Sequence, residues 1–305
     1  MIEKRTLGTN GPSIPALMFG AWPIGGGMGT VDEAVATATI RQAIDRGIVA
    51  IDTAEYYRTS ESVIGNALVG LPREQIFLAT KVSTEPFTQT GVRVALENSL
   101  HALRTDYVDL YQLHSFPKDL PLEEAMAGLA AAQRSGKARY VGVSNFTIEQ
   151  LDRARRIYPI QSLQPRFNLF DVAAADDLIP YCYANGVGVI AHSPLAKGLL
   201  AGTYRPGHVF PADDERRQFP RFQGEAFVRH TAAVDALASF ARQRNVSLVQ
   251  LAIAWTLAHP GVTAAIVGAK SPKQIDEQPG ALDMRLSPDD VAQLRTIAAQ
   301  ATAAK

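Results

Sequence analysis

The stretch Gly47–Tyr57 reads GIVAIDTAEYY and joins a short apolar run to an abrupt polar end. Residues 48–51 are all apolar, which is typical of a strand in a parallel sheet that is covered on both faces. Asp52 then falls where the strand ends, and Tyr57 falls in the loop that follows. Asp52 and Tyr57 would then lie at the same opening, where an acid could orient a neighbouring side chain and a phenol could donate a proton. This pattern predicts half of a catalytic site.

The same alternation of strand and helix continues on both sides of this stretch. Short apolar runs predict strands over residues 17–20, 48–51, 75–80, 107–113, 138–143, 162–164, 187–191 and 264–267. Helical patterns cover residues 32–46, 60–68, 91–103, 122–134, 148–157, 173–184, 226–244 and 247–259, and a last pair precedes the C-terminus. Eight such units predict an α/β protein with a parallel (β/α)8 TIM barrel.

The ends of the chain add two expectations to this fold. The first fifteen residues predict a small β-hairpin, with turn residues Thr9, Asn10 and Gly11, that plugs one end of the fold. No linker or shift of composition divides the rest, so residues 1–305 are expected to form a single domain. Length alone left this open, because 305 residues with 47% hydrophobic content suit one barrel or two domains.

Composition narrows the class of function. Thirty basic and thirty acidic residues are interspersed, so neither nucleic acid nor a membrane surface is an expected partner. Cys182 is the only cysteine, which excludes an intramolecular disulfide and a cysteine-based metal site, and no metal is expected. The N-terminus lacks the apolar core of a signal peptide, and no run stays apolar for roughly 20 residues, so a cytoplasmic location is expected.

In a barrel of this kind the active site lies at the carboxyl ends of the strands. The polar residues that follow the predicted strands are Asp52, Tyr57, Lys81, His114, Ser144, Asn145, Gln164 and Ser193. Each of them alone is more often a hydrogen-bonded surface residue than a catalyst. An active site is predicted because all of these residues would lie together at one end of the barrel.

Their chemistry suggests proton donation to a developing alkoxide. An ammonium at Lys81 would stabilise the phenolate of Tyr57 and lower its pKa toward the neutral range. A carboxylate at Asp52 would hold that ammonium in place and keep it protonated. His114 would hydrogen-bond a substrate oxygen and fix it near the phenol.

These motifs resemble those of the aldo-keto reductases, and the resemblance covers nearly the whole chain. DTAEYY, LATK and DLYQLH are similar to the segments that carry the family's Asp, Tyr, Lys and His tetrad, here Asp52, Tyr57, Lys81 and His114. The resemblance implies an NADPH-dependent (β/α)8 enzyme that interconverts small carbonyl compounds and alcohols. GVSNF at residues 142–146 resembles the segment that binds the nicotinamide carboxamide, which implies Ser144 and Asn145, with Gln164 as the third ligand.

Two later segments resemble the family's cofactor motifs. SPLAKGLLAG at 193–202 is similar to the pyrophosphate loop, and IVGAKSPKQIDEQ at 266–278 is similar to the adenosine-phosphate segment. The implied cofactor residues are Ser193, Pro194, Leu195, Lys197 and Gly198 for the first, and Gly268, Lys270, Ser271, Gln274, Glu277 and Gln278 for the second. A cation and a hydroxyl at Lys270 and Ser271 favour NADPH over NADH. The alternative is that residues 270–273 are only a solvated helix start.

Within the family the chain resembles the bacterial general-reductase branch, which shares AWPIGGGMG around Trp22 and the DDERRQFPRFQGEAF pattern. That resemblance adds Trp22 to the cofactor residues. His192 departs from the pattern, because it stands where an aromatic residue usually stacks beneath the nicotinamide, and imidazole has a smaller face and can titrate. Gln278 replaces the customary Asn, and Arg58 follows Tyr57 where Gly is common.

Two other functions fit part of the pattern. A barrel with a strand-end lysine such as Lys81 is also the architecture of a Schiff-base aldolase. A non-catalytic NADPH-binding regulatory subunit is the second alternative, although an intact tetrad favours an enzyme. The loops at residues 22–29, 85–89, 116–118 and 203–224 are expected to form the pocket walls, so the motifs do not specify the substrate.

Overall fold

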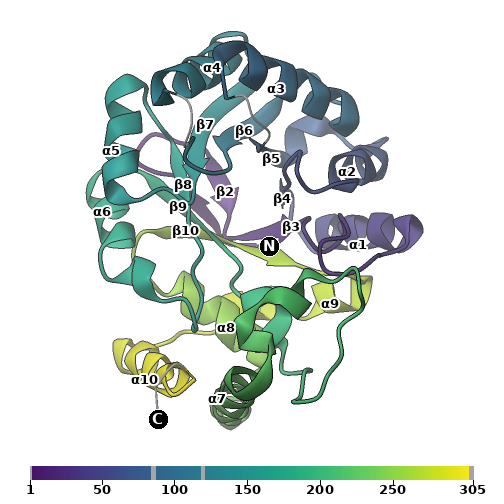
Figure 1. The fold of residues 1–305 in the computed structure, drawn as a ribbon, viewed down its shortest axis with the longest axis vertical. Coiled ribbons are helices and arrows are strands. Elements are labelled where there is room, and N and C mark those ends of the chain that lie inside the picture. The colour runs from purple at the N-terminus through teal and green to yellow at the C-terminus, as the bar shows by residue number, and fades with distance from the viewer. Residues whose placement is uncertain (1, 84–86, 118–120, 302–305) are drawn as a thin grey trace.

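The computed structural model describes residues 2–83, 87–117 and 121–301, and its strands form a closed parallel barrel inside a ring of helices (Figure 1). The strands follow the order β10-β3-β4-β5-β6-β7-β8-β9 around the barrel. They are β3 (Leu17–Gly20), β4 (Ala50–Asp52), β5 (Phe77–Val82), β6 (Val108–Leu113), β7 (Ala138–Ser144), β8 (Ser162–Gln164), β9 (Gly188–His192) and β10 (Val262–Gly268). The predicted (β/α)8 fold is therefore confirmed.

The helices begin close to where the sequence predicted them, because side chains cap their first turns. Asp32 accepts hydrogen bonds from two backbone amides at the start of α1, and Thr147 and Ser247 form capping boxes for α5 and α8. The α-helices are α1 (Glu33–Asp45), α2 (Ser60–Leu68), α3 (Gln89–Leu103), α4 (Leu122–Arg134), α5 (Ile148–Ile157), α6 (Leu178–Ala184), α7 (Gly224–Gln243), α8 (Leu248–Leu257), α9 (Pro272–Asp276) and α10 (Pro288–Ala299). Short 3-10 turns lie between them, at η1 (Arg73–Gln75), η2 (Ala173–Ala175), η3 (Ala196–Ala201), η4 (Glu215–Gln218), η5 (Pro220–Phe222) and η6 (Gln278–Asp283).

Two predicted boundaries were wrong for physical reasons. The expected helix over residues 173–184 is divided into η2 and α6, because Asp177 turns out of the helix and its carboxylate caps Leu178. Strand β5 runs from Phe77 to Val82, two residues later than predicted at each end, because η1 occupies residues 73–75. Lys81 therefore lies inside a strand rather than after one.

The N-terminal hairpin closes the floor of the barrel, as predicted. Its strands β1 (Lys4–Thr6) and β2 (Ser13–Pro15) pair antiparallel. The fully buried Leu7 and Ile14 pack against side chains that line the barrel interior. Gln161, just before β8, donates a hydrogen bond to the Leu7 carbonyl, at the end of the barrel where the strands begin. Access to the interior is therefore from the opposite end, where the strands finish.

No helix among residues 2–83, 87–117 and 121–301 is long and apolar enough to cross a bilayer. The helices instead pack their apolar faces on the outside of the barrel. A second, smaller apolar cluster joins the hairpin side chains Leu7 and Ile14 to strand residues such as Ala50, Ala79 and Leu110. Polar side chains lie inside the barrel at the opposite end, where the strands finish.

One buried acid lies outside the barrel, between α2 and β5. Glu61 is 7% exposed, and its carboxylate accepts a hydrogen bond of 2.6 Å from the Thr80 hydroxyl. Burial raises the pKa of Glu61 above its ordinary value, and the bond from Thr80 opposes that shift. The folded protein therefore holds this proton to higher pH than the unfolded chain, and folding stability is lost as pH rises above about 4.5.

Glu61→Gln is expected to stabilise the protein at pH 7, because the amide oxygen still accepts from Thr80 and no buried charge remains. Each 1 kcal/mol gained corresponds to a rise of roughly 2–4 °C in the thermal midpoint of a chain near this size. The gain should disappear at pH 4, where the native carboxyl is protonated. Thermal unfolding followed by circular dichroism at both pH values measures it, with the exposed Glu74→Gln as control. A gain that is the same at both pH values would show that the charge is not its origin.

Candidate active site

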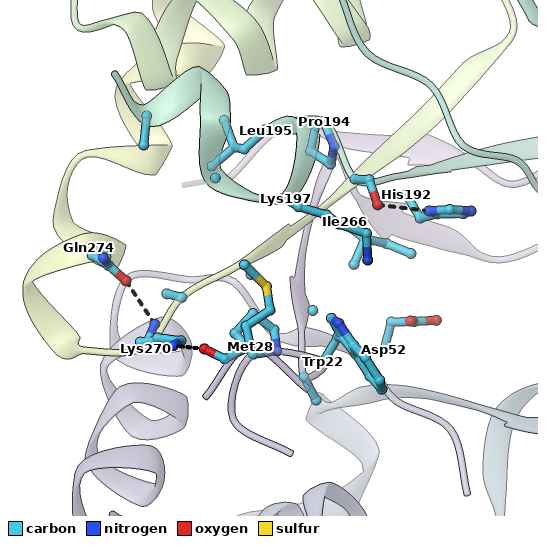
Figure 2. A pocket seen from close by; sticks show the side chains of 18 of the residues that line it. Trp22, Met28, Asp52, His192, Pro194, Leu195, Lys197, Ile266, Lys270 and Gln274 are labelled. Carbon is cyan, nitrogen blue, oxygen red and sulfur yellow. Dashed lines mark hydrogen bonds between the residues drawn. The ribbon is translucent and has the colours of Figure 1, made fainter. Parts of the chain in front are cut away.

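A cavity of about 620 Å³ opens at the carboxyl ends of the barrel strands. Every predicted site residue except Lys81 and Ser271 lines it. Figure 2 shows Asp52 and His192 at one end of this cavity and Lys270 with Gln274 at the other. The sequence motifs from both halves of the chain thus meet in one elongated pocket.

Asp52, at the floor of this pocket, forms an ion pair with Lys81, which does not line the cavity. The Lys81 ammonium is fully buried and lies 2.5 Å from Asp52 Oδ1 and 2.9 Å from the Thr53 carbonyl oxygen. Burial lowers the pKa of Lys81, but attraction to Asp52 and to Tyr57 outweighs it and leaves the pKa raised. The contact has the geometry expected if Asp52 holds the ammonium in place, and the raised pKa of Lys81 favours its protonated form.

Tyr57 lies over this pair, and its ring centre is 5.1 Å from the Lys81 ammonium nitrogen. Its ring packs edge-on against Trp22 at 4.9 Å and His114 at 5.6 Å between centroids. The expected lowering of its pKa is wrong in net direction. Burial raises the pKa of Tyr57 above 10, Lys81 lowers it as foreseen, and Asp52 raises it again. The phenol is therefore protonated at neutral pH, which suits a proton donor.

His114 is a neutral imidazole. Burial, and then the charge of Lys81, lower the pKa of His114 to about 3. Its Nδ1 lies 2.5 Å from the Ser83 hydroxyl, which leaves the other ring nitrogen for the pocket that His114 lines. A neutral imidazole can still hydrogen-bond a substrate oxygen, as predicted, and it avoids a second positive charge next to Lys81.

His192 and its neighbours form a hydrogen-bonded group on the opposite wall. The imidazole Nδ1 lies 3.0 Å from the Ser193 hydroxyl, and Nε2 lies 3.0 Å from the Asn145 side-chain oxygen. Burial, followed by the nearby Arg166, lowers the pKa of His192 to about 3. The imidazole that the sequence placed here as a group able to titrate is therefore neutral at physiological pH.

The expected carboxamide ligands are close together, and they also bind each other and the ion pair. The buried Ser144 hydroxyl donates to the Gln164 carbonyl oxygen at 2.9 Å, and the Asn145 amide donates to Ser144 at 3.1 Å. The Gln164 amide donates to Asp52 Oδ2 at 2.8 Å. Gln164 thus connects this wall to the Lys81 pair, a link that sequence reasoning missed.

Left-handed backbone is concentrated around the pocket. Asn145, Ser193, Ala196 and Lys197 have φ between 48° and 60°, a conformation that costs a non-glycine residue free energy. Gly198 follows at φ 87°. Residues 193–198 therefore form a tight turn, and Ser193, Pro194, Leu195, Lys197 and Gly198 of this turn line the cavity.

The far end of the pocket carries the segment after β10. The Lys270 ammonium donates a hydrogen bond to the Met28 carbonyl, and its backbone amide donates to the Gln274 side chain at 2.8 Å (Figure 2). Gly268, Glu277 and the buried Gln278 line the same end. Ser271 precedes α9 without capping it and does not line the cavity.

Residues 203–224 form a strap that contacts the loop at residues 22–30. Glu215 accepts hydrogen bonds from Trp22 Nε1 at 2.6 Å and from the Lys197 ammonium at 2.5 Å. Asp213 accepts from the Thr30 backbone and hydroxyl, both at 2.9 Å. This strap was foreseen as a pocket wall, but the roles of Glu215 and its neighbours were not.

Other lining residues were not singled out from sequence, among them Tyr56, Arg166, Tyr204 and Arg216. Arg166 had a detectable signal, because it follows Gln164 by two residues and strand side chains alternate with period two. Of the loops expected to form walls, residues 85–86 and 118 lie outside the described residues.

Comparison with known proteins agrees with the geometry over nearly the whole chain. Aldo-keto reductase YhdN of Bacillus subtilis is 35% identical over 97% of this chain and 93% of its own length. The glycerol dehydrogenase AKR11B4 from Gluconobacter oxydans superposes with a TM-score of 0.87 at 31% identity, over 97% and 94% of the two chains. An aldo-keto reductase from Klebsiella pneumoniae in complex with NADPH superposes with a TM-score of 0.77 at 30% identity, over 96% and 94%. Since the model of the aldo/keto reductase family also matches residues 16–299, the chain belongs to that family.

Proposed function

We propose that this protein reduces aldehydes or ketones to alcohols with NADPH, and that Tyr57 supplies the proton. The observation that carries the proposal is the buried Lys81–Asp52 pair beneath a protonated phenol, in a pocket that also holds a neutral imidazole at His114. Membership of the family and the NADPH complex of a relative support NADP(H) as the cofactor.

The pocket fits such a cofactor in shape and chemistry. A cavity of about 620 Å³ is within the usual range for ligand sites, and it extends from the Asp52 end to the Lys270 end (Figure 2). Ser144, Asn145 and Gln164 would hold the carboxamide, and the loop at 193–198 would hold the diphosphate. Bound NADPH would supply the hydride that the carbonyl carbon accepts.

The side chains then complete the reaction at the carbonyl oxygen. His114 donates a hydrogen bond to that oxygen and places it beside the Tyr57 hydroxyl. As the carbon gains a hydride, the oxygen becomes negatively charged and takes the phenolic proton, so the carbonyl becomes an alcohol. Lys81 stabilises the phenolate that remains, and Asp52 fixes Lys81.

The burial of Lys81 argues against the aldolase alternative. An amine forms an imine only when it is neutral and accessible, whereas the Lys81 ammonium is fully buried, bound to Asp52 and Thr53, and has a raised pKa. The regulatory-subunit alternative predicts no turnover. Oxidation of NADPH followed at 340 nm with a panel of aldehydes, ketones and sugars distinguishes it from an enzyme.

Tyr57→Phe should lower kcat by about 100-fold to 10,000-fold, because general acid catalysis contributes that much. The Kd for NADPH should change less than about threefold, since the ring and its packing remain. Steady-state rates and fluorescence titration of NADPH measure the two effects. The exposed Tyr183→Phe, on α6, is the matched control. Near-normal turnover in Tyr57→Phe would remove the proposed proton donor.

The neutral state of His192 predicts how cofactor binding depends on pH. Because the pKa of His192 is about 3, its charge does not change between pH 5.5 and 8. The ratio of the NADPH Kd values of His192→Phe and wild type should therefore be constant within about twofold over this range. Comparing the ratio cancels the titration of the cofactor's own phosphate. A tenfold change in the ratio between pH 6 and 7 would mean that the imidazole titrates there.

Lys270→Ala should weaken NADPH binding and spare NADH. A charge-assisted hydrogen bond to the 2′-phosphate contributes about 1.5–3 kcal/mol, which is roughly ten-fold to a hundred-fold in Kd. Fluorescence titration of both nucleotides against both proteins measures this. Lys273→Ala is the control, because Lys273 is exposed on α9 and does not line the pocket. Equal losses for the two nucleotides would contradict a specific phosphate contact.

A further inference from the structure

The positively charged side chains that line the pocket differ in whether they already have a hydrogen-bond or ion-pair partner within the protein. Lys197 is bound to Glu215, and the Lys270 ammonium is bound to the Met28 carbonyl. Arg216 is paired with Asp214 and also donates to the Tyr204 hydroxyl. Arg166 is exposed and, within the described residues, has no hydrogen bond or ion pair. Arg166 is therefore the one cation in this set whose side chain has no partner among the described residues.

The backbone places Arg166 at the substrate end of the pocket. Arg166 follows Gln164, which binds Asp52, by two residues, so its Cα lies about 7 Å further toward the mouth on the same inward-facing side of the chain. It forms a parallel bridge with His192, and the amide of Phe167 donates to the His192 carbonyl oxygen. Lys270 lies at the far end of the pocket (Figure 2), and Lys197, whose charge also reaches His192, is paired with Glu215.

The surroundings of Arg166 do not neutralise it. The carboxylate of Asp171 is close enough to be affected by Arg166, but it already holds Arg221 through two hydrogen bonds of 2.6 and 3.0 Å. The imidazoles of His114 and His192 are neutral, and Lys81 is neutralised by Asp52. One uncompensated positive charge thus faces the substrate end of the site.

We propose that Arg166 recognises an anionic group on the substrate, so that the preferred substrates are carbonyl compounds that carry a carboxylate or a phosphate. This inference rests on the proposed reductase function and names the substrate class of that site. A planar guanidinium pairs with both oxygens of such a group, which gives orientation as well as affinity. Neutral aldehydes of the same shape are poorer substrates.

The test compares substrates that differ only in charge. 4-Carboxybenzaldehyde is paired with methyl 4-formylbenzoate, and glyceraldehyde 3-phosphate with glyceraldehyde, so that the two pairs also separate carboxylate from phosphate recognition. Arg166→Met should lower kcat/KM for the preferred anion about ten-fold to a hundred-fold, mainly through KM, and should change the neutral partner less than about threefold. Arg166→Lys should recover part of the loss, because it keeps the charge without the fork. Arg156→Met, an exposed arginine on α5, is the control.

Three results would overturn the inference. The first is a wild type that prefers the neutral member of both pairs, and the second is an Arg166→Met variant with unchanged kinetics for the anionic substrates. The third is an Arg166→Met variant that loses kcat/KM equally for both members of a pair and binds NADPH more weakly, which would assign Arg166 to the cofactor. If the wild type reduces none of the four compounds and none of the wider panel of aldehydes, ketones and sugars, the proposed reductase function fails instead. Calorimetric binding of benzoate against benzamide to the NADP⁺-loaded protein then decides the inference alone. It is supported if Arg166→Met abolishes benzoate binding, and it is overturned if benzoate binds wild type and variant equally.

Discussion

The buried ion pair between Lys81 and Asp52 is the interaction on which the rest of the site depends. Two charges are held inside the barrel, where the loss of hydration is costly unless every donor and acceptor is satisfied. Lys81 binds Asp52 and the Thr53 carbonyl, and the second oxygen of Asp52 accepts from Gln164. Removing one partner would leave an unpaired buried charge, at a cost of about 3–5 kcal/mol. Tyr57 and the Gln164 wall are therefore positioned by the same requirement that keeps the pair intact.

The sequence predicted the barrel well because its signals are local. Apolar runs that end in Asp52 or His114 identify strands and their carboxyl ends, and capping residues such as Asp32 identify helix starts. Signals of that kind do not extend to Lys81, whose place within β5 depends on the turn at η1. Asp177 likewise divided an expected helix because a capping carboxylate competes with helix continuation.

The electrostatics of the site were less predictable because burial is a property of the assembled fold. The sign of the Lys81 effect on Tyr57 was correct, but the larger effect of burial reversed the net shift. The same holds for His192, whose low pKa reflects the surrounding side chains. Hydrogen bonds such as Gln164 with Asp52, or Asn145 with His192, join segments far apart in the chain, and no sequence motif predicts them.

Lys197 and Arg216 already have carboxylate partners in the free protein. A cofactor phosphate that binds either cation must replace that partner, so the net affinity for the cofactor is smaller than the sum of the contacts formed.

The hairpin at the floor has a practical consequence for handling the protein. The residues before Thr6 lie at the end of the barrel where its strands begin. Arg5 there donates hydrogen bonds to backbone carbonyls at the end of α8 and at the start of β10. A peptide fused before this hairpin would emerge on the face opposite the pocket mouth. Attachment to a solid support through such a fusion would orient every molecule with its pocket toward the solution.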